Sequence, residues 1–124
     1  MKAEFFVFVH KGFELIPLYT EKVSGEILET NGRMLGICKF DNDETVIVYD
    51  IESGLSIAKM PAERFEVSML FDFVKRFEKY MADNRKTDVT RREWCTEIIK
   101  IEYDKHPEIK KQVFGEVENG NETS

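Results

Sequence analysis

Residues 44–82 decide the fold and read ETVIVYDIESGLSIAKMPAERFEVSMLFDFVKRFEKYMA. Residues 45–51 alternate in side-chain type and are rich in β-branched residues, which is typical of a β-strand. Residues 52–54 are a cluster of turn formers, in which Gly54 is free to adopt a positive φ. The alternation resumes after this turn, so we predict that residues 45–51 and 55–60 pair as a hairpin.

A long amphipathic helix is predicted to follow from Pro61, because a missing N–H costs nothing at the first helical position. Residues 61–66 taken alone are also compatible with a strand. The apolar side chains of the helix fall on two adjacent stripes that together occupy more than half of its circumference. The first stripe comprises Val67, Leu70, Phe71, Val74, Phe77 and Met81, and the second comprises Phe65, Met69, Phe73 and Tyr80.

A surface helix needs only one apolar stripe, so this helix should be covered on two sides. We expect the sheet to cover one stripe. The C-terminal helices, which are the simpler choice, or a second chain would cover the other. Phe65, Met69, Phe73 and Tyr80 are therefore candidates for a protein-interaction or oligomer surface.

Strands also dominate the sequence before residue 44. Residues 3–9 are apolar on both faces, and residues 13–19 continue the extended pattern, with Pro17 placing them at an edge or a bulge. Residues 21–25 are expected to be a polar connection. Asn31-Gly32 is the preferred pair for a type I′ turn, so residues 26–30 should pair with residues 33–40. Gly36, inside the second of these strands, indicates a bulge or a close backbone approach.

Helices are predicted after residue 84. Thr90 and Glu93 have the spacing of a capping box, and the helix that they open carries Trp94, Cys95, Ile98, Ile99 and Ile101 on one face. It should end near Tyr103 or Asp104, because Pro107 restricts the residue before it. A last helix should run from Pro107 to Phe114, with Gly115 as its stop.

The fold class that follows is α+β, because strands come first and helices afterwards. We predict an N-terminal antiparallel meander of about six short strands, packed by a long amphipathic helix and by one or two further C-terminal helices. Residues 1–115 should form a single domain, with the sheet over residues 3–60 and helices over 61–114. Residues 116–124 are predicted to be a disordered acidic tail.

The composition limits the classes of function. The chain has 124 residues, is 42% hydrophobic and carries a formal charge of −6, which argues against a nucleic-acid or anionic-membrane surface. Because residue 4 is acidic and the apolar run that follows is short, we expect neither a signal peptide nor a membrane span at this end. Cys38 and Cys95 lie far apart without metal-binding spacing, so we expect free thiols and cytoplasmic localisation.

No catalytic or metal-binding pattern is recognisable. His10 and His106 are the two histidines, and a zinc site would need three or four converging ligands. The acidic turn at residues 41–44 lacks the register of an EF-hand loop, and no phosphate-binding or nucleophile motif is present. We therefore expect neither a cofactor nor a metal, and no enzymatic activity.

One basic strip could contact nucleic acid. Arg85, Lys86, Arg91 and Arg92 lie around a predicted helix N-terminus, where side chains and backbone N–H groups together can bind phosphate. Asp83, Asp88 and Glu93 interrupt this strip, so an ordinary solvated loop is the simpler interpretation.

The function that these observations favour is a non-catalytic intracellular protein-interaction or regulatory module that self-associates, with a homodimer as one form. Its small size and lack of recognisable chemistry would suit an accessory protein of a bacterial phage or mobile element. Two alternatives remain open: a nucleic-acid-binding accessory protein that uses residues 85–92, and a small-molecule-binding domain with a pocket between sheet and helices.

Overall fold

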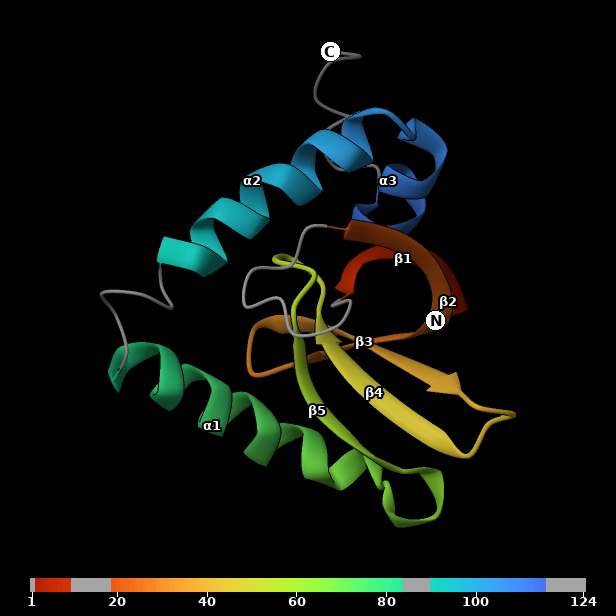
Figure 1. Ribbon diagram of the computed structural model, residues 1–124, viewed down its shortest axis with the longest axis vertical. Helices are drawn as coiled ribbons and strands as arrows, with labels where there is room; N and C mark the ends of the chain where they lie inside the picture. Colours follow the sequence, from red (N-terminus) through yellow and green to blue (C-terminus); the bar gives the residue numbers. More distant parts are fainter. Residues whose placement is uncertain (1, 10–18, 84–89, 116–124) are drawn as a thin grey trace.

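The computed structural model describes residues 2–9, 19–83 and 90–115. These residues form one five-stranded antiparallel sheet followed by three α-helices, which confirms the predicted α+β class (Figure 1). The strands are β1 (Lys2–Val9), β2 (Tyr19–Thr30), β3 (Arg33–Phe40), β4 (Thr45–Asp50) and β5 (Ser56–Pro61). Two 3₁₀ turns, η1 (Ala62–Arg64) and η2 (Val67–Met69), precede α1 (Leu70–Asp83), α2 (Thr90–Asp104) and α3 (Pro107–Phe114).

The strand order is that of a simple meander, β1-β2-β3-β4-β5. Asn31 and Gly32 both have positive φ angles, 54° and 77°, as a type I′ turn requires, and Thr30 pairs with Arg33 on either side. The β4–β5 hairpin also forms as predicted, with φ of 74° at Gly54. The sixth predicted strand falls on residues 13–19, of which 13–18 lie outside the described residues.

The prediction that residues 21–25 connect two strands is wrong, because they belong to β2. This strand pairs with β1 from Tyr19 to Glu26 and with β3 from Glu26 to Thr30, so it changes partner at Glu26. A side chain at Gly25 would lie 2.3 Å from the Ile37 carbonyl oxygen, so only glycine fits where the strand passes from one partner to the next. Glu21, Lys22 and Ser24 are exposed and polar, so this part of β2 lacks the alternation of apolar residues by which a strand is recognised in a sequence.

At Gly36 another part of the chain approaches the backbone closely, as predicted. This close approach allows β1 to pack against β3 and β4. A side chain at Gly36 would lie 2.4 Å from the Phe5 ring. The Phe5 ring therefore lies directly over the backbone of β3, and it also makes an edge contact with Tyr49 of β4. Figure 1 shows the same arrangement in the ribbon, where β1 and β2 curve over the rest of the sheet.

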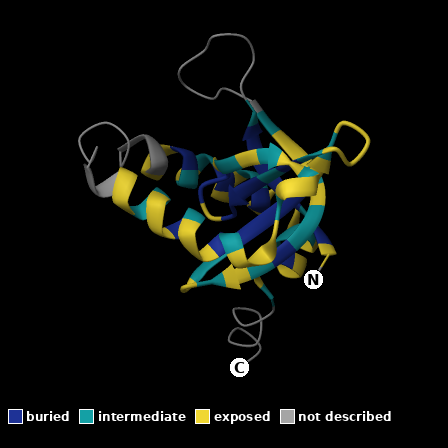
Figure 2. Ribbon diagram, turned by 90° about the horizontal axis from the view of Figure 1, so that it is seen from below, coloured by how far each residue is buried: buried dark blue, intermediate teal, exposed yellow. Residues whose placement is uncertain are grey.

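The core consists of two clusters of buried side chains. One cluster contains apolar residues from both faces of β1 together with Cys95, Ile99 and Tyr103 of α2 and Val113 of α3. The second contains Leu35, Ile37, Val46 and Val48 of the sheet with Leu70 and Val74 of α1. Figure 2 shows buried residues concentrated in the centre and exposed residues on the outer turns of the helices. In this arrangement α1 packs against β3 and β4, whereas α2 and α3 pack against β1.

The free edge of β1 is closed by two hydrogen bonds. The Phe6 N–H donates to the Tyr103 hydroxyl at 3.1 Å, and the Phe8 N–H donates to the Gly54 carbonyl at 2.8 Å. Unpaired N–H groups on an edge strand invite pairing with another chain. The α2 helix and the β4–β5 turn therefore protect this edge.

The predicted helix start at Pro61 is wrong. Pro61 ends β5, and the Ala62 N–H continues the ladder by donating to the Glu44 carbonyl at 2.8 Å. Phe65 and Glu66 have extended backbones, with ψ angles of 134° and 142°, so α1 begins only at Leu70. The periodicity of the sequence predicts two helical turns before Leu70. The hydrogen bond from Ala62 to Glu44 and the extended backbone at Phe65 and Glu66 take their place, and both depend on tertiary contacts.

The C-terminal helices end where expected, but the apolar residues of α2 do not share one face. The helix ends at Asp104, and α3 spans Pro107–Phe114 with Gly115 at a φ of 82°. Cys95 and Ile99 are buried, whereas Trp94 and Ile101 are 45% and 56% exposed. The predicted tail, residues 116–124, lies outside the described residues.

Candidate functional site

The four residues predicted as an interaction surface occupy different environments. Phe65 and Phe73 are half-buried and pack against the cluster beneath α1, and Met69 is half-buried in η2. Tyr80 is 50% exposed. No finding tests whether another protein binds these residues, so this surface stays a prediction.

Cations lie over three aromatic rings of the wide apolar arc of α1. The Arg33 guanidinium lies 5.3 Å from the Phe77 ring centre, Lys75 lies 5.1 Å from that of Phe71, and Arg76 lies 5.3 Å from that of Phe73. Long cationic side chains cover apolar surface with their stems and attract aromatic faces with their charges. The cations therefore cover part of the arc, but Phe71 and Tyr80 remain about half exposed.

The basic strip stays a prediction as well. Arg85 and Lys86 lie outside the described residues, and for Arg91 and Arg92 only the backbone, which is part of α2, is described.

An apolar row on α2, which we name the α2 stripe, consists of the exposed Trp94 and Ile101 and of Ile98, which packs in part against the core cluster. Its residues are spaced by four and three positions, so they lie along one side of the helix. Trp94 and Ile101 are about half exposed, and Ile98 is half-buried. Cys95, Ile99 and Tyr103 on the opposite side of α2 are at most 2% exposed, which fixes the helix to the core. The stripe is therefore held on a packed element.

Ion pairs lie on the outer side of this stripe. Lys100 pairs with Glu97 at 3.7 Å, and Lys110 of α3 pairs with Asp104 at 2.8 Å. Lys105, which directly follows α2, is exposed. The rim of the stripe is thus charged, but its acidic groups already have basic neighbours.

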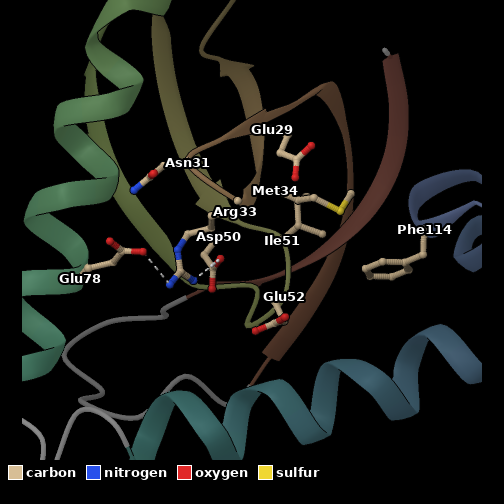
Figure 3. Close-up of a pocket in the computed structure, with 10 residues that line it drawn as sticks. Glu29, Asn31, Arg33, Met34, Asp50, Ile51, Glu52, Glu78 and Phe114 are labelled. Atoms are coloured by element: carbon tan, nitrogen blue, oxygen red, sulfur yellow. Dashed lines mark hydrogen bonds and ion pairs between the residues drawn. The ribbon is translucent and has the colours of Figure 1, made fainter.

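A second feature is a hollow of about 360 Å³ between the β2–β3 turn, the β4–β5 turn, α1 and the end of α3 (Figure 3). Its centre is Arg33, which donates to Asp50 at 3.2 Å and to Glu78 of α1 at 3.3 Å. Asp50 is completely buried and also accepts from the Ser53 hydroxyl at 2.6 Å and from the Ser53 N–H at 3.3 Å. The network joins three elements that are distant in the sequence.

Sequence reasoning missed Arg33 and Asp50 as a pair. Their side chains meet only because β3 and β4 are adjacent and because α1 brings Glu78 to the same place. The weak signal in the sequence was Asp50 itself, a charged residue at the end of an otherwise apolar strand.

The chemistry of this hollow is that of a structural junction. Carboxylates of Glu29, Asp50, Glu52 and Glu78 line it together with one guanidinium. Its described lining contains no histidine, cysteine or hydroxyl nucleophile. The Arg33 Nε is buried without a hydrogen-bond partner, while the other two guanidinium nitrogens hold carboxylates.

Burial keeps the Cys38 thiol and two tyrosine hydroxyls of the core protonated. Burial raises the pKa of the Cys38 thiol from 9.0 to about 12, so this thiol stays protonated at neutral pH. Burial likewise raises the pKa values of Tyr49 and Tyr103 to about 12. Within the described part of the chain, no group of three or more His, Cys, Asp or Glu side chains could hold a metal ion.

Comparison of the chain with protein-family models, with curated proteins and with solved structures finds no match in any of the three. Among the described helices, none combines the length and the apolar character needed to cross a membrane.

Proposed function

We propose that this protein is a non-catalytic interaction module that binds another protein chain through the α2 stripe. The supporting observation is the division of α2 into two apolar sides. One side, with Cys95 and Ile99, is buried in the core, and the other, with Trp94 and Ile101, is about half exposed. A stable fold needs only the first of these sides, so the second is available for a partner.

The chemistry of the stripe suits protein recognition. Tryptophan is the residue most enriched at the energetic centres of interfaces, and isoleucine supplies apolar area beside it. Because the opposite side of α2 is packed, binding would order few additional groups and would cost little conformational entropy. The charged rim formed by Glu97, Lys100 and Asp104 resembles the polar rim of known interfaces.

The free thiols favour a reducing compartment for this function. Cys38 and Cys95 are both buried and unbridged. Disulfides persist in oxidising compartments and are rare in the cytosol. We therefore place the proposed interaction in the cytoplasm.

The test is affinity purification of the tagged protein from its native host, followed by quantitative mass spectrometry. Ile101→Glu should remove the bound protein, because it places a charge at the centre of the apolar contact. Val67→Glu is the matched control, because Val67 is 60% exposed, lies on η2 and is not part of the α2 stripe. The proposal fails if wild type and Ile101→Glu retain the same proteins in the same amounts.

A further inference from the structure

We infer that the α2 stripe binds the α2 stripe of a second copy of this chain, with the two helices antiparallel about a two-fold axis. This inference rests on the proposed function and specifies its partner. It follows from the spacing of Trp94, Ile98, Ile101 and Lys105, from the charge at the end of this series, and from the ion pairs on its rim.

The spacing is that of a helix–helix seam. The steps from Trp94 to Ile98, to Ile101 and to Lys105 are four, three and four residues, as between alternating core positions of a coiled coil. Lys105 follows the last helical residue, Asp104, and its N–H donates to the Ile101 carbonyl at 3.3 Å, so it continues the helical turn. The series therefore offers a second helix a continuous row of side chains.

The row is complementary to itself in the antiparallel direction. With the axis between Ile98 and Ile101, Ile98 of each copy faces Ile101 of the other. Trp94 then faces Lys105 of the second copy at both ends of the seam, where an ammonium group and an indole face attract each other. A parallel pair would instead oppose Lys105 to Lys105, which is repulsive. The sequence of the stripe thus selects the antiparallel orientation.

The rim permits this pairing. Glu97 and Asp104 lie on the same side of the stripe, so an antiparallel pair brings these acids of the two copies near each other. Each acid already has a cation of its own chain, with Lys100 at 3.7 Å from Glu97 and Lys110 at 2.8 Å from Asp104. These ion pairs reduce the like-charge repulsion that the second copy would otherwise meet.

The size of the seam sets the strength that we expect. Stable complexes bury about 800 Å² per partner, and three stripe residues with one lysine cover less than this. The dimer should therefore be reversible, with a dissociation constant on the order of 10 μM or weaker. Two-fold dimers are the commonest closed assemblies, because one patch serves both subunits.

Sedimentation equilibrium over a concentration series tests the inference. Wild type and Val67→Glu should form dimers, and Ile101→Glu should remain monomeric. Trp94 is the one tryptophan of the chain, so its fluorescence emission should shift to shorter wavelength as the dimer forms. A wild-type monomer at millimolar concentration, or a dimer that Ile101→Glu leaves intact, would overturn the inference.

A disulfide experiment tests the orientation. When Trp94→Cys and Lys105→Cys proteins are mixed at high concentration and oxidised, the mixed disulfide should exceed either symmetric disulfide. Cys38 and Cys95 are buried and should not compete. A predominance of the symmetric Trp94→Cys disulfide, or the absence of a mixed disulfide, would contradict the antiparallel pairing.

Crosslinking in cells distinguishes a second copy of the chain from a different partner. A photoreactive amino acid in place of Ile101 should crosslink to a second copy of the chain in cells. If the purified chain is monomeric and the crosslink leads to a different protein, the second-copy assignment falls and the interaction module stands. If the chain is monomeric and no protein is crosslinked, both fall.

Discussion

Arg33 shows how a single guanidinium can hold several elements together. It contacts Asp50 at the end of β4, Glu78 on α1 and the Phe77 ring. The two carboxylates differ in burial, since the Asp50 side chain is 0% exposed and that of Glu78 is 42% exposed. A buried carboxylate depends on its cation much more than an exposed one does, because water cannot replace the lost interaction.

We predict that Arg33→Ala lowers the free energy of unfolding by about 2–4 kcal/mol, because it removes the Arg33 cation from the buried Asp50 carboxylate. Glu78→Ala is the matched control, and it should cost less than about 1 kcal/mol because that carboxylate reaches water. Urea unfolding with an unchanged slope would measure both values. Equal costs for the two variants would show that burial of Asp50 is not what makes the pair important.

Gly36 is required for a steric reason. An alanine methyl carbon at this position would lie 2.4 Å from the Phe5 ring and 2.9 Å from the Ile51 side chain, and both of those residues are fully buried. We predict that Gly36→Ala costs about 1–3 kcal/mol of unfolding free energy through overpacking.

Replacing the Phe5 ring by a smaller side chain should reduce the loss of unfolding free energy that Gly36→Ala causes. In the Phe5→Leu background, Gly36→Ala should cost distinctly less than in wild type, as a double-mutant cycle would show. Gly32→Ala is the control, because no atom lies within 4 Å of its added carbon and its cost arises from the φ of +77°. Strict additivity of Phe5→Leu and Gly36→Ala would contradict the steric explanation.

The helices divide two tasks between them. The α1 helix carries more apolar residues, but cations of the same helix and Arg33 cover its aromatic rings. The α2 helix closes the edge of β1 through Tyr103 and leaves its own stripe exposed. Phe71 and Tyr80 of α1 nevertheless remain about half exposed, as do Trp94 and Ile101 of α2.

We predict that Tyr103→Phe costs about 1–3 kcal/mol, because it leaves the buried N–H of Phe6 without an acceptor. Hydrogen exchange of the Phe6 amide should accelerate more than the global loss of stability explains. Tyr49→Phe is the control, because within the described residues the structure gives the Tyr49 hydroxyl no hydrogen bond. A Phe6 amide that exchanges as slowly in Tyr103→Phe as in wild type would show that the edge is closed without this bond.

The core of the molecule contains buried weak acids, and their burial affects its behaviour in alkali. Cys38, Tyr49 and Tyr103 belong to one core cluster, and burial raises the pKa of each to about 12, from 9.0 for the thiol and 10.0 for the phenols. In the unfolded chain the three groups lose their protons first, whereas the folded chain keeps them.

We predict that the free energy of unfolding is insensitive to these groups below about pH 9 and falls between about pH 9 and pH 12. The sign follows because the folded state binds more protons than the unfolded state in this range. Tyrosinate absorbance and circular dichroism should change together as the chain unfolds. Cys38→Ala should delay the onset toward pH 10, the ordinary pKa of tyrosine, and an unchanged onset would contradict the role of the thiol.

The turns and the ends of the C-terminal helices could be predicted from the sequence, because they depend on the conformational preferences of single residues. Asn31-Gly32 and Gly54 predicted their turns, because few other residues adopt positive φ cheaply. The stop of α2 and the extent of α3 followed from Pro107 and Gly115. The first half of β2 was missed because its pairing with β1, and not its own pattern, makes it a strand.

For the candidate site, the sequence predicted which residues belong to the helix but not which of them are exposed. The sequence identified Trp94, Cys95, Ile98, Ile99 and Ile101 as apolar residues of one helix. Which of them face the core depends on the side from which β1 meets α2, and that contact joins residues nearly a hundred positions apart. Because no residue of α2 encodes this direction, the sequence analysis assigned all five to one face of the helix.

The sequence by itself therefore determined the class of fold, the order of strands and helices, and the turns, because these depend on neighbours a few residues apart. The tertiary structure decided that α1 begins at Leu70, that Arg33 joins β3 to β4 and α1, and that Trp94 and Ile101 of α2 face away from the core. Each of these outcomes depends on packing between distant segments, where burial and pairing outweigh local preference.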